Sequence, residues 1–206
     1  MTIAENSMQR PSLTSLTRKA GAVTALALGL LVSGAYAKID DSARYEPVAP
    51  TIDQARANIL IARQLQFTHF RNLGISDELS GDVFDAYLNY LDSQRIYLTQ
   101  EDIDALSRVK KHLGSALKTG QLQPGFDIYN LVQQRVIERL KFALGLIDNG
   151  IEQLDFAADE RIRVDRSEAP WEANQAALDE LWTKRIKNAV LAQRLNGADD
   201  DAIEET

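Results

Sequence analysis

Two charged residues of opposite sign, Asp92 and Arg95, lie three positions apart near the middle of the sequence. A carboxylate and a guanidinium at this spacing can form an ion pair. If both side chains are solvated, the pair contributes only ~0.2–0.5 kcal/mol. The alternative is that Arg95 reaches across a turn of the chain and fixes its angle. The sequence leaves both interpretations open.

The serines lack the neighbours that nucleophilic catalysis needs. A nucleophilic serine requires a base, an orienting group and oxyanion donors, usually in a strained strand-to-helix turn. A serine–lysine dyad is possible by composition, but it requires a glycine-rich oxyanion loop that the sequence does not contain. Paired carboxylates such as Glu101-Asp102 fall in expected first helical turns, where the helix dipole explains them. We therefore predict no catalytic residue, after considering Ser76, Ser80, Ser93, Ser107, Ser115 and Ser167.

Metal and cofactor sites are not expected either. The two histidines, His69 and His112, are 43 positions apart, and the chain has no cysteine. This is a poor ligand set for a metal. We expect His69 on a helix surface. The glycines are isolated, so no phosphate-binding loop is present, and we predict neither a cofactor-binding residue nor a metal ligand.

The Asp92–Arg95 pair stands between two expected helices. Apolar residues at helical spacing precede it, in a helix that we expect Ser80 to open, and Ile96-Tyr97-Leu98 follows as a run too short for a helix. Thr99 and the acidic residues behind it are typical of a helix N-terminus. The sequence predicts a helix, a buried hydrophobic corner and a second helix, with the corner at the centre of the core.

Further helices are predicted along the rest of the chain. Thr51 and Gln54 form a capping-box pattern. The first helix has an apolar face from Ile52 through Ala55, Ile59, Ala62, Leu65 and His69 to Leu73, and Gly74 is its expected end. The remaining expected helices run from Thr99 to Gly120, from near Asp127 to Asn149-Gly150, and from Pro170-Trp171 to Asn196-Gly197.

The region 159–166 is expected to be extended, with Ile162 and Val164 facing inward, or else to form a short helical turn. Together these segments predict an all-α protein, an irregular multi-helix bundle of about five to six helices. The residues after Gly197 are either an acidic tail or the start of a further element.

The first 37 residues have the pattern of a cleavable signal peptide. Basic residues (Arg10, Arg18 and Lys19) precede an apolar run from Ala20 to Gly34, and Ala35-Tyr36-Ala37 is a signal-peptidase pattern. The run is shorter than the ~20 residues that span a bilayer, although an uncleaved anchor is the alternative. We therefore expect segments 1–37 (signal peptide), 38–50 (extended lead-in), 51–197 (helical domain) and 198–206 (acidic tail), with export to a periplasm.

The net charge argues against two classes of partner. Cleavage after Ala37 removes three basic residues and one acidic residue, which leaves 20 Lys and Arg against 29 Asp and Glu, a net charge of −9. Phosphate backbones and anionic lipid heads repel such a chain. We expect no nucleic-acid partner and no stable membrane anchor after cleavage.

Two stretches carry a family resemblance. The run from Tyr87 to Leu98, followed by Asp102-Ile103, is similar to the N-terminal helical domain of bacterial tail-specific proteases, the carboxy-terminal processing peptidases. The second stretch joins 165–171 to 178–188, and 126–130 also fits. The resemblance extends over roughly Ile52 to Leu195.

The resemblance implies a periplasmic serine protease with a Ser/Lys dyad, in which PDZ and protease domains follow the helical domain. No catalytic residue of that family falls on a position of this sequence, so activity of the chain alone is not expected. We interpret the 206 residues as a truncated reading frame, one part of a split gene or a deliberately shortened chain.

The leading hypothesis is a non-catalytic N-terminal scaffold or docking domain. Its partners are the PDZ and catalytic domains, an adaptor protein and the protein substrates of the protease. The alternative is a free-standing periplasmic helical adaptor or chaperone-like binding module.

Overall fold

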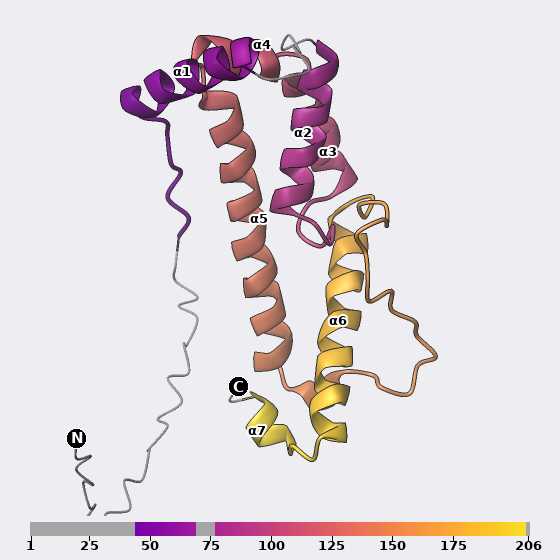
Figure 1. Cartoon of the computed structure of the whole chain (residues 1–206). Coiled ribbons are helices and arrows are strands. Elements are labelled where there is room, and N and C mark those ends of the chain that lie inside the picture. The colour runs from indigo at the N-terminus through magenta and orange to yellow at the C-terminus, as the bar shows by residue number, and fades with distance from the viewer. Residues whose placement is uncertain (1–43, 69–76, 205–206) are drawn as a thin grey trace, which may run out of the picture. The chain divides into compact units, whose positions relative to one another are not determined.

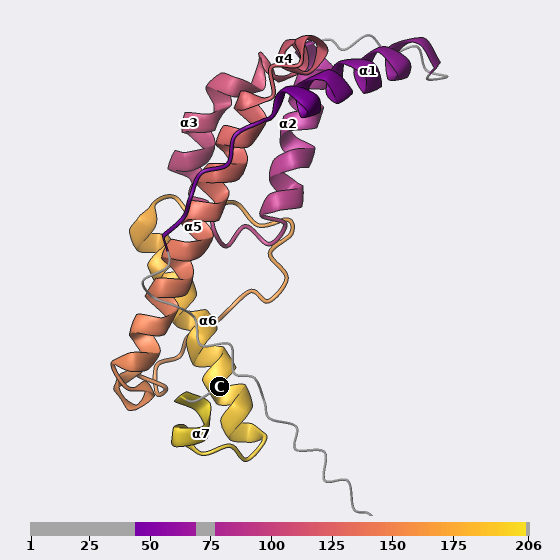
Figure 2. The ribbon, with the colours of Figure 1, turned by 90° about the vertical axis from the view of Figure 1, so that its left-hand side faces the viewer.

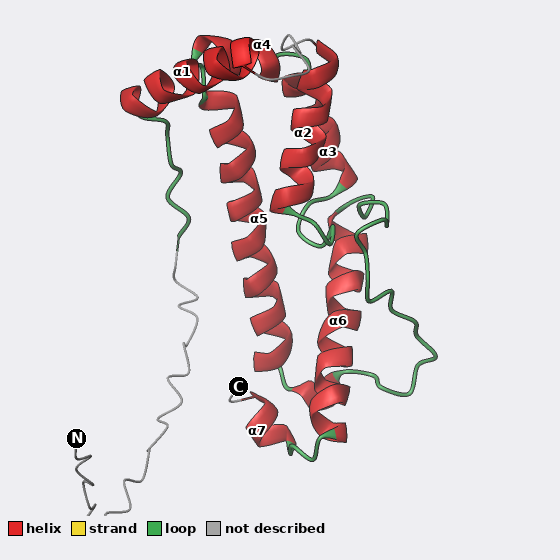
Figure 3. Cartoon of the chain, viewed as in Figure 1, coloured by secondary structure: helices red, strands yellow, loops and turns green. Residues whose placement is uncertain are grey.

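The computed structural model describes residues 44–68 and 77–204 of the chain. In these ranges every regular element is helical, and the extended backbone forms only one isolated parallel bridge, between Thr99 and Glu172 (Figure 3). The predicted all-α, multi-helix class is confirmed. The elements, labelled in Figure 1, are α1 (Ile52–Thr68), α2 (Asp77–Leu91), α3 (Gln100–Lys110), α4 (Leu113–Thr119), α5 (Gln123–Asp148), the 3₁₀ helix η1 (Ile151–Gln153), α6 (Gln175–Leu195) and α7 (Asp200–Glu204).

Several predictions concern residues outside these ranges. They are the signal peptide of residues 1–37 and the positions of His69, Leu73, Gly74 and Ser76. None of the helices in the described ranges combines the length and the apolar character required to cross a bilayer.

Helix α1 begins at the predicted capping box. The Thr51 N–H donates to Gln54 Oε1 at 2.8 Å, and the Gln54 N–H donates to Thr51 Oγ1 at 3.2 Å. The predicted apolar face is only partly correct. Ala55, Ile59 and Ala62 are half-buried, but Ile52 and Leu65 are exposed because α1 packs mainly on the short helix α4.

The helix predicted from Thr99 to Gly120 is wrong in one respect, because it is two helices. The chain breaks at Lys111 and His112, and α4 turns to lie against α1 and α2. The hydroxyl of Ser80 accepts the Gly114 N–H at 2.9 Å, so it satisfies a donor of the first turn of α4. Ser80 therefore does not open α2, which begins at Asp77.

Two predicted helix starts are also wrong. Helix α5 begins at Gln123 rather than near Asp127, because Pro124 fits in a first turn, where its missing N–H costs nothing. Helix α6 begins at Gln175 rather than at Pro170-Trp171, and the Asn174 side chain caps it by accepting the Ala177 N–H at 3.1 Å.

The segment before α6 departs from its prediction in one side chain. Residues 159–166 form no regular helix, but Val164 is 76% exposed and does not face inward. At the other end of α6, the helix stops at Leu195 and Gly197 has φ +90°. The short α7 follows, held by two hydrogen bonds from Arg194 to Asp200 at 2.8 and 2.9 Å. The predicted start of a further element thus corresponds to α7.

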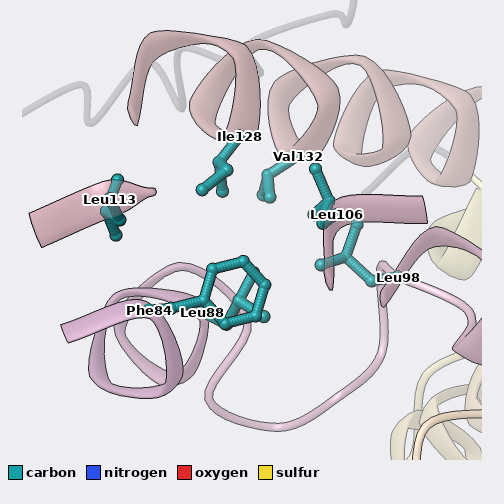
Figure 4. Close-up of a cluster of buried hydrophobic side chains, with 7 residues drawn as sticks. All are labelled: Phe84, Leu88, Leu98, Leu106, Leu113, Ile128 and Val132. Atoms are coloured by element: carbon teal, nitrogen blue, oxygen red, sulfur yellow. The ribbon is translucent and has the colours of Figure 1, made fainter. Parts of the chain in front are cut away.

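Two clusters of buried side chains form the core, and α5 contributes to both. Figure 4 shows the first, to which α2, α3, α4 and α5 all contribute. The second lies between α5 and α6 and is centred on Leu178 and Trp182. The corner joins them, because Ile96 belongs to the second cluster and Leu98 to the first. The predicted central role of the corner is confirmed.

Candidate functional site

The Asp92 carboxylate organises the corner. It is 1% exposed and accepts the backbone N–H groups of Ile96 at 2.9 Å and Leu98 at 3.0 Å, with Tyr97 N–H at 3.3 Å. The indole Nε1–H of Trp171 donates to it at 3.2 Å. One buried carboxylate thus fixes the path of three consecutive residues that belong to no helix.

Arg95 does not form the solvated pair with Asp92. Its backbone has φ +52°, and its guanidinium donates to the carbonyl of Ala169. The same guanidinium lies over the Trp171 ring, 4.6 Å from the centroid, in cation–π geometry. The solvated-pair interpretation is wrong, and the alternative, in which Arg95 reaches across the turn, describes the structure.

The segment 166–172 is tied to the corner from the other side. Arg166 is buried. Its guanidinium donates to Glu172 Oε1 at 2.8 Å, and its backbone N–H donates to Gln94 Oε1 at 3.0 Å. The Gln100 N–H donates to the Glu172 carbonyl at 2.8 Å. The start of α3 is therefore bound to a segment that lies about seventy residues away in sequence.

Helix α6 is anchored at the same place. The Trp182 Nε1–H donates to the carbonyl of Ile96 at 2.6 Å, and the Tyr97 and Trp182 ring centroids are 5.9 Å apart. Both predicted residues at this junction are in place, Trp182 buried and Tyr97 half-buried. The two stretches of the family resemblance therefore meet in one hydrogen-bonded cluster.

The N-terminus of α3 carries an ion pair that the sequence did not reveal. Thr99 and Asp102 form a capping box, and Arg135 of α5 donates to Asp102 at 2.7 and 3.1 Å. Burial alone raises the pKa of Asp102, but the hydrogen bonds from Arg135 and Thr99 outweigh it and hold the pKa below its ordinary value. Hydrogen bonding to Asp102 likewise raises the pKa of Arg135. The dipole explanation of the Glu101-Asp102 pair was thus incomplete, since Asp102 also links α3 to α5.

Four of the described serines form hydrogen bonds that hold the fold. Besides Ser80, three hydroxyls donate to a backbone carbonyl or carboxylate within three residues: Ser107 to Asp104 at 2.6 Å, Ser115 to His112 at 2.8 Å, and Ser167 to Asp165 at 2.8 Å. His112 is exposed at the start of α4. In the described part of the chain, no three His, Cys, Asp or Glu side chains are grouped closely enough to hold a metal ion.

The strongest candidate for an interaction is an exposed apolar surface on α1. We define the α1 surface as Leu60, Ile61, Leu65 and Phe67, which are 66%, 59%, 54% and 81% exposed. The opposite side of α1 is held on α4, where Asn58 donates to the Leu117 carbonyl. Figure 2 shows the second half of α1 running past α4. Large apolar side chains gathered on one exposed element indicate a protein-contact surface.

Comparison with known proteins identifies the family of this helical domain. Residues 61–206 match the family described as the tail specific protease N-terminal domain. The chain belongs to this family. It is similar to the tail-specific protease of Haemophilus influenzae, with 32% identity over 133 residues, which are 64% of this chain and 19% of that protein. The chain therefore spans about a fifth of the length of this relative.

The tail-specific protease N-terminal domain match begins within α1 and includes the whole corner. Sequence reasoning identified the residues of that corner but missed the acceptor role of Asp92, the Asp102–Arg135 pair and the Asn174 cap. The cap had a local signal in an asparagine three positions before Ala177. The Asp102–Arg135 pair joins residues 33 positions apart and left no local signal. Asp92 accepts nearby backbone N–H groups, but its Trp171 donor lies 79 positions away.

Proposed function

We propose that the chain is the non-catalytic N-terminal helical domain of a periplasmic tail-specific serine endopeptidase, and that it serves as a scaffold and docking domain. The membership of residues 61–206 in the N-terminal domain family supports this proposal. Such a protease degrades or processes proteins from their C-termini. The partners proposed for the domain are the PDZ and catalytic domains, protein substrates and an adaptor protein.

The α1 surface is the proposed docking face for the other domains of the protease. Burying a Leu, Ile or Phe side chain contributes about 1.5–3 kcal/mol, so the four residues are the main source of free energy for the proposed contact. The interaction is apolar and depends little on salt. The remainder of the chain is acidic, and its charge disfavours binding to nucleic acid and to anionic membranes.

A paired-substitution experiment tests the docking role. The chain is mixed with the separately purified part of the Haemophilus influenzae tail-specific protease that lies outside the matched segment, and association is measured by analytical ultracentrifugation. Ile61→Asp with Leu65→Asp is expected to weaken association at least about tenfold. The matched control is Leu195→Asp, at an 87% exposed position at the end of α6. Equal effects of the two changes would argue against docking through α1.

The free-standing adaptor remains the second proposal, because an exposed apolar surface also suits capture of unfolded polypeptide. The two proposals predict different coding sequences downstream of Thr206. A reading frame for PDZ and protease domains, in phase after Thr206 or one frameshift away, supports the first proposal. Its absence, together with retention of C-terminally apolar peptides by the purified chain, supports the adaptor.

We propose the domain boundaries and the location as in the sequence analysis. Residues 1–37 are a signal peptide, 38–50 a lead-in, 51–197 the helical domain and 198–206 an acidic end. Cleavage after Ala37 predicts a periplasmic product whose first residue is Lys38, which N-terminal sequencing of the fractionated protein checks. A product that retains residues 1–37 in the membrane fraction would indicate an uncleaved anchor.

A further inference from the structure

The segment before α1 is held on α5 in an unusual way. We define the N-terminal strap as residues 44–50, which form no regular element and run alongside α5 (Figure 2). The side-chain amide of Asn130 accepts the Val48 N–H at 3.1 Å and donates to the Val48 carbonyl at 2.9 Å. The Tyr45 hydroxyl donates to the same amide oxygen.

Asn130 forms hydrogen bonds with the backbone of Val48 and not with its side chain. An asparagine amide has a donor and an acceptor in one plane, and a residue in extended chain directs its N–H and C=O to the same side. Asn130 therefore satisfies Val48 as a neighbouring β-strand would. Backbone pairing supplies affinity for any extended segment, and adjacent pockets supply selectivity.

Pockets of this kind lie on both sides of Asn130. A cavity of about 510 Å³ is bounded by the strap and by Tyr87, Phe126 and Tyr129. A second, of about 310 Å³, is bounded by the strap and by an α5 surface that includes Gln134 and Ile137. We define the Asn130 groove as Asn130 together with these two cavities, and the strap leaves much of it unfilled. The first cavity is aromatic, as in grooves that bind proline-containing segments.

The length of the Asn130 groove matches that of the strap. From Phe126 to Lys141 the lining residues extend over fifteen positions of α5, ~22 Å at 1.5 Å per residue. Seven extended residues span ~20 Å. Pro47 and Pro50 favour that extended form. Yet most strap side chains are exposed, including Val48 at the clamped position, so the strap is held by few contacts.

We infer that the Asn130 groove is a binding site for an extended, proline-containing polypeptide segment, and that the strap occupies it in cis. The ligand has an aromatic residue three positions before the clamped residue, as Tyr45 precedes Val48. The strap reduces the apparent affinity for a segment from another chain, because only the fraction of molecules with an open groove can bind. This site is independent of the α1 surface and of the docking role proposed above.

The test uses the full chain and a fluorescent peptide with the sequence of residues 44–51. The released variant carries Tyr45→Ala and Val48→Pro, which remove the hydroxyl and the N–H that Asn130 accepts. Fluorescence anisotropy is expected to give a Kd for the released variant about tenfold below that of the original chain. A peptide with proline in place of the clamped valine is expected to bind weakly to both.

A third substitution assigns the binding to the clamp. Asn130→Asp in the released variant removes the amide donor and is expected to raise the Kd at least about tenfold. Gln123→Ala on the same helix is the matched control and is expected to leave the Kd unchanged. Circular dichroism and thermal melting establish that each variant is folded. Peptide binding that is insensitive to Asn130→Asp, or no binding by a folded released variant, overturns the inference.

Discussion

The Trp171 indole donates a hydrogen bond to the Asp92 carboxylate at 3.2 Å, although the two residues are 79 positions apart in the chain. Asp92 follows α2, and Trp171 precedes α6. The same carboxylate accepts the N–H groups that begin the path toward α3. This single interaction therefore connects the turn between α2 and α3 to the segment that leads into α6.

Replacing the Asp92 carboxylate tests its structural role. Asp92→Asn keeps the shape, but its NH₂ group faces N–H donors and can accept from none of them. A buried donor without a partner costs about 1–3 kcal/mol, so we expect a loss of about 3 kcal/mol in the free energy of unfolding, measured by urea titration. The control Asp53→Asn, at an exposed α1 position, is expected to change it by less than about 0.5 kcal/mol. A loss below about 1 kcal/mol for Asp92→Asn would contradict the account of the corner.

The two tryptophans of the chain, Trp171 and Trp182, both lie at this corner and report on its cooperativity. Trp171→Phe and Trp182→Phe each leave one tryptophan, which can be excited selectively, and remove one hydrogen bond at a cost of about 1–3 kcal/mol each. If the corner unfolds as one unit, the fluorescence transition of each variant should coincide with its circular dichroism transition. Separate transitions within one variant would show that the clusters around Leu98 and Trp182 unfold independently.

The parts of the fold that were predictable are those set by local chemistry. The helix starts after Thr51 and Thr99 follow from capping boxes within four residues, and the end of α5 follows from Asn149-Gly150. The break at Lys111 and His112 was not predictable, because the apolar spacing continues across it. After the break, the Gly114 N–H of α4 finds its acceptor in Ser80, a residue of another helix.

The site follows the same division. The apolar composition of the corner indicated burial, so the core position of Leu98 was predictable. The choice between a solvated Asp92–Arg95 pair and a bridging Arg95 was not, because it depends on Ala169 and Trp171. The α1 surface was not predicted, because only Leu65 of its four residues belongs to the predicted apolar face, and helical spacing does not reveal how much of a helix its neighbours cover.

The stability of the domain should depend on pH through Asp102. Its pKa is lowered in the folded state, so its contribution is complete above the unfolded value of about 3.9 and is lost as the pH falls through the folded value. Asp102→Asn is expected to cost about 1–2 kcal/mol at pH 7 and to give a smaller decline in stability below pH 5 than the original chain shows. Asp104→Asn, exposed on the same helix, is the control. Parallel pH profiles for the Asp102 variant and the original chain would contradict this assignment.

Alanine substitution at three glycines distinguishes the cost of backbone strain from the cost of the steric contact that Gly120 makes at the α1–α4 junction. Gly120 has φ +73°, and a Cβ there would lie 2.9 Å from the Ala55 carbonyl oxygen. Gly197 has φ +90° with open space around it, and Gly145 lies within α5 with nothing within 4 Å. Alanine should therefore cost about 1–2 kcal/mol at Gly197, from the left-handed backbone alone, and about 2–4 kcal/mol at Gly120, where α1 must also move. At Gly145 it should stabilise by about 0.5–1 kcal/mol.

Thermal melting and proteolysis of the three glycine variants check this order. Because α1 is held mainly on α4, Gly120→Ala should also expose the α1 backbone to protease before the rest of the domain unfolds. Gly197→Ala should leave cleavage within α1 unchanged, since it lies after α6. If Gly120→Ala costs no more than Gly197→Ala and α1 stays protected, the close approach of α1 to Gly120 does not hold the two helices together.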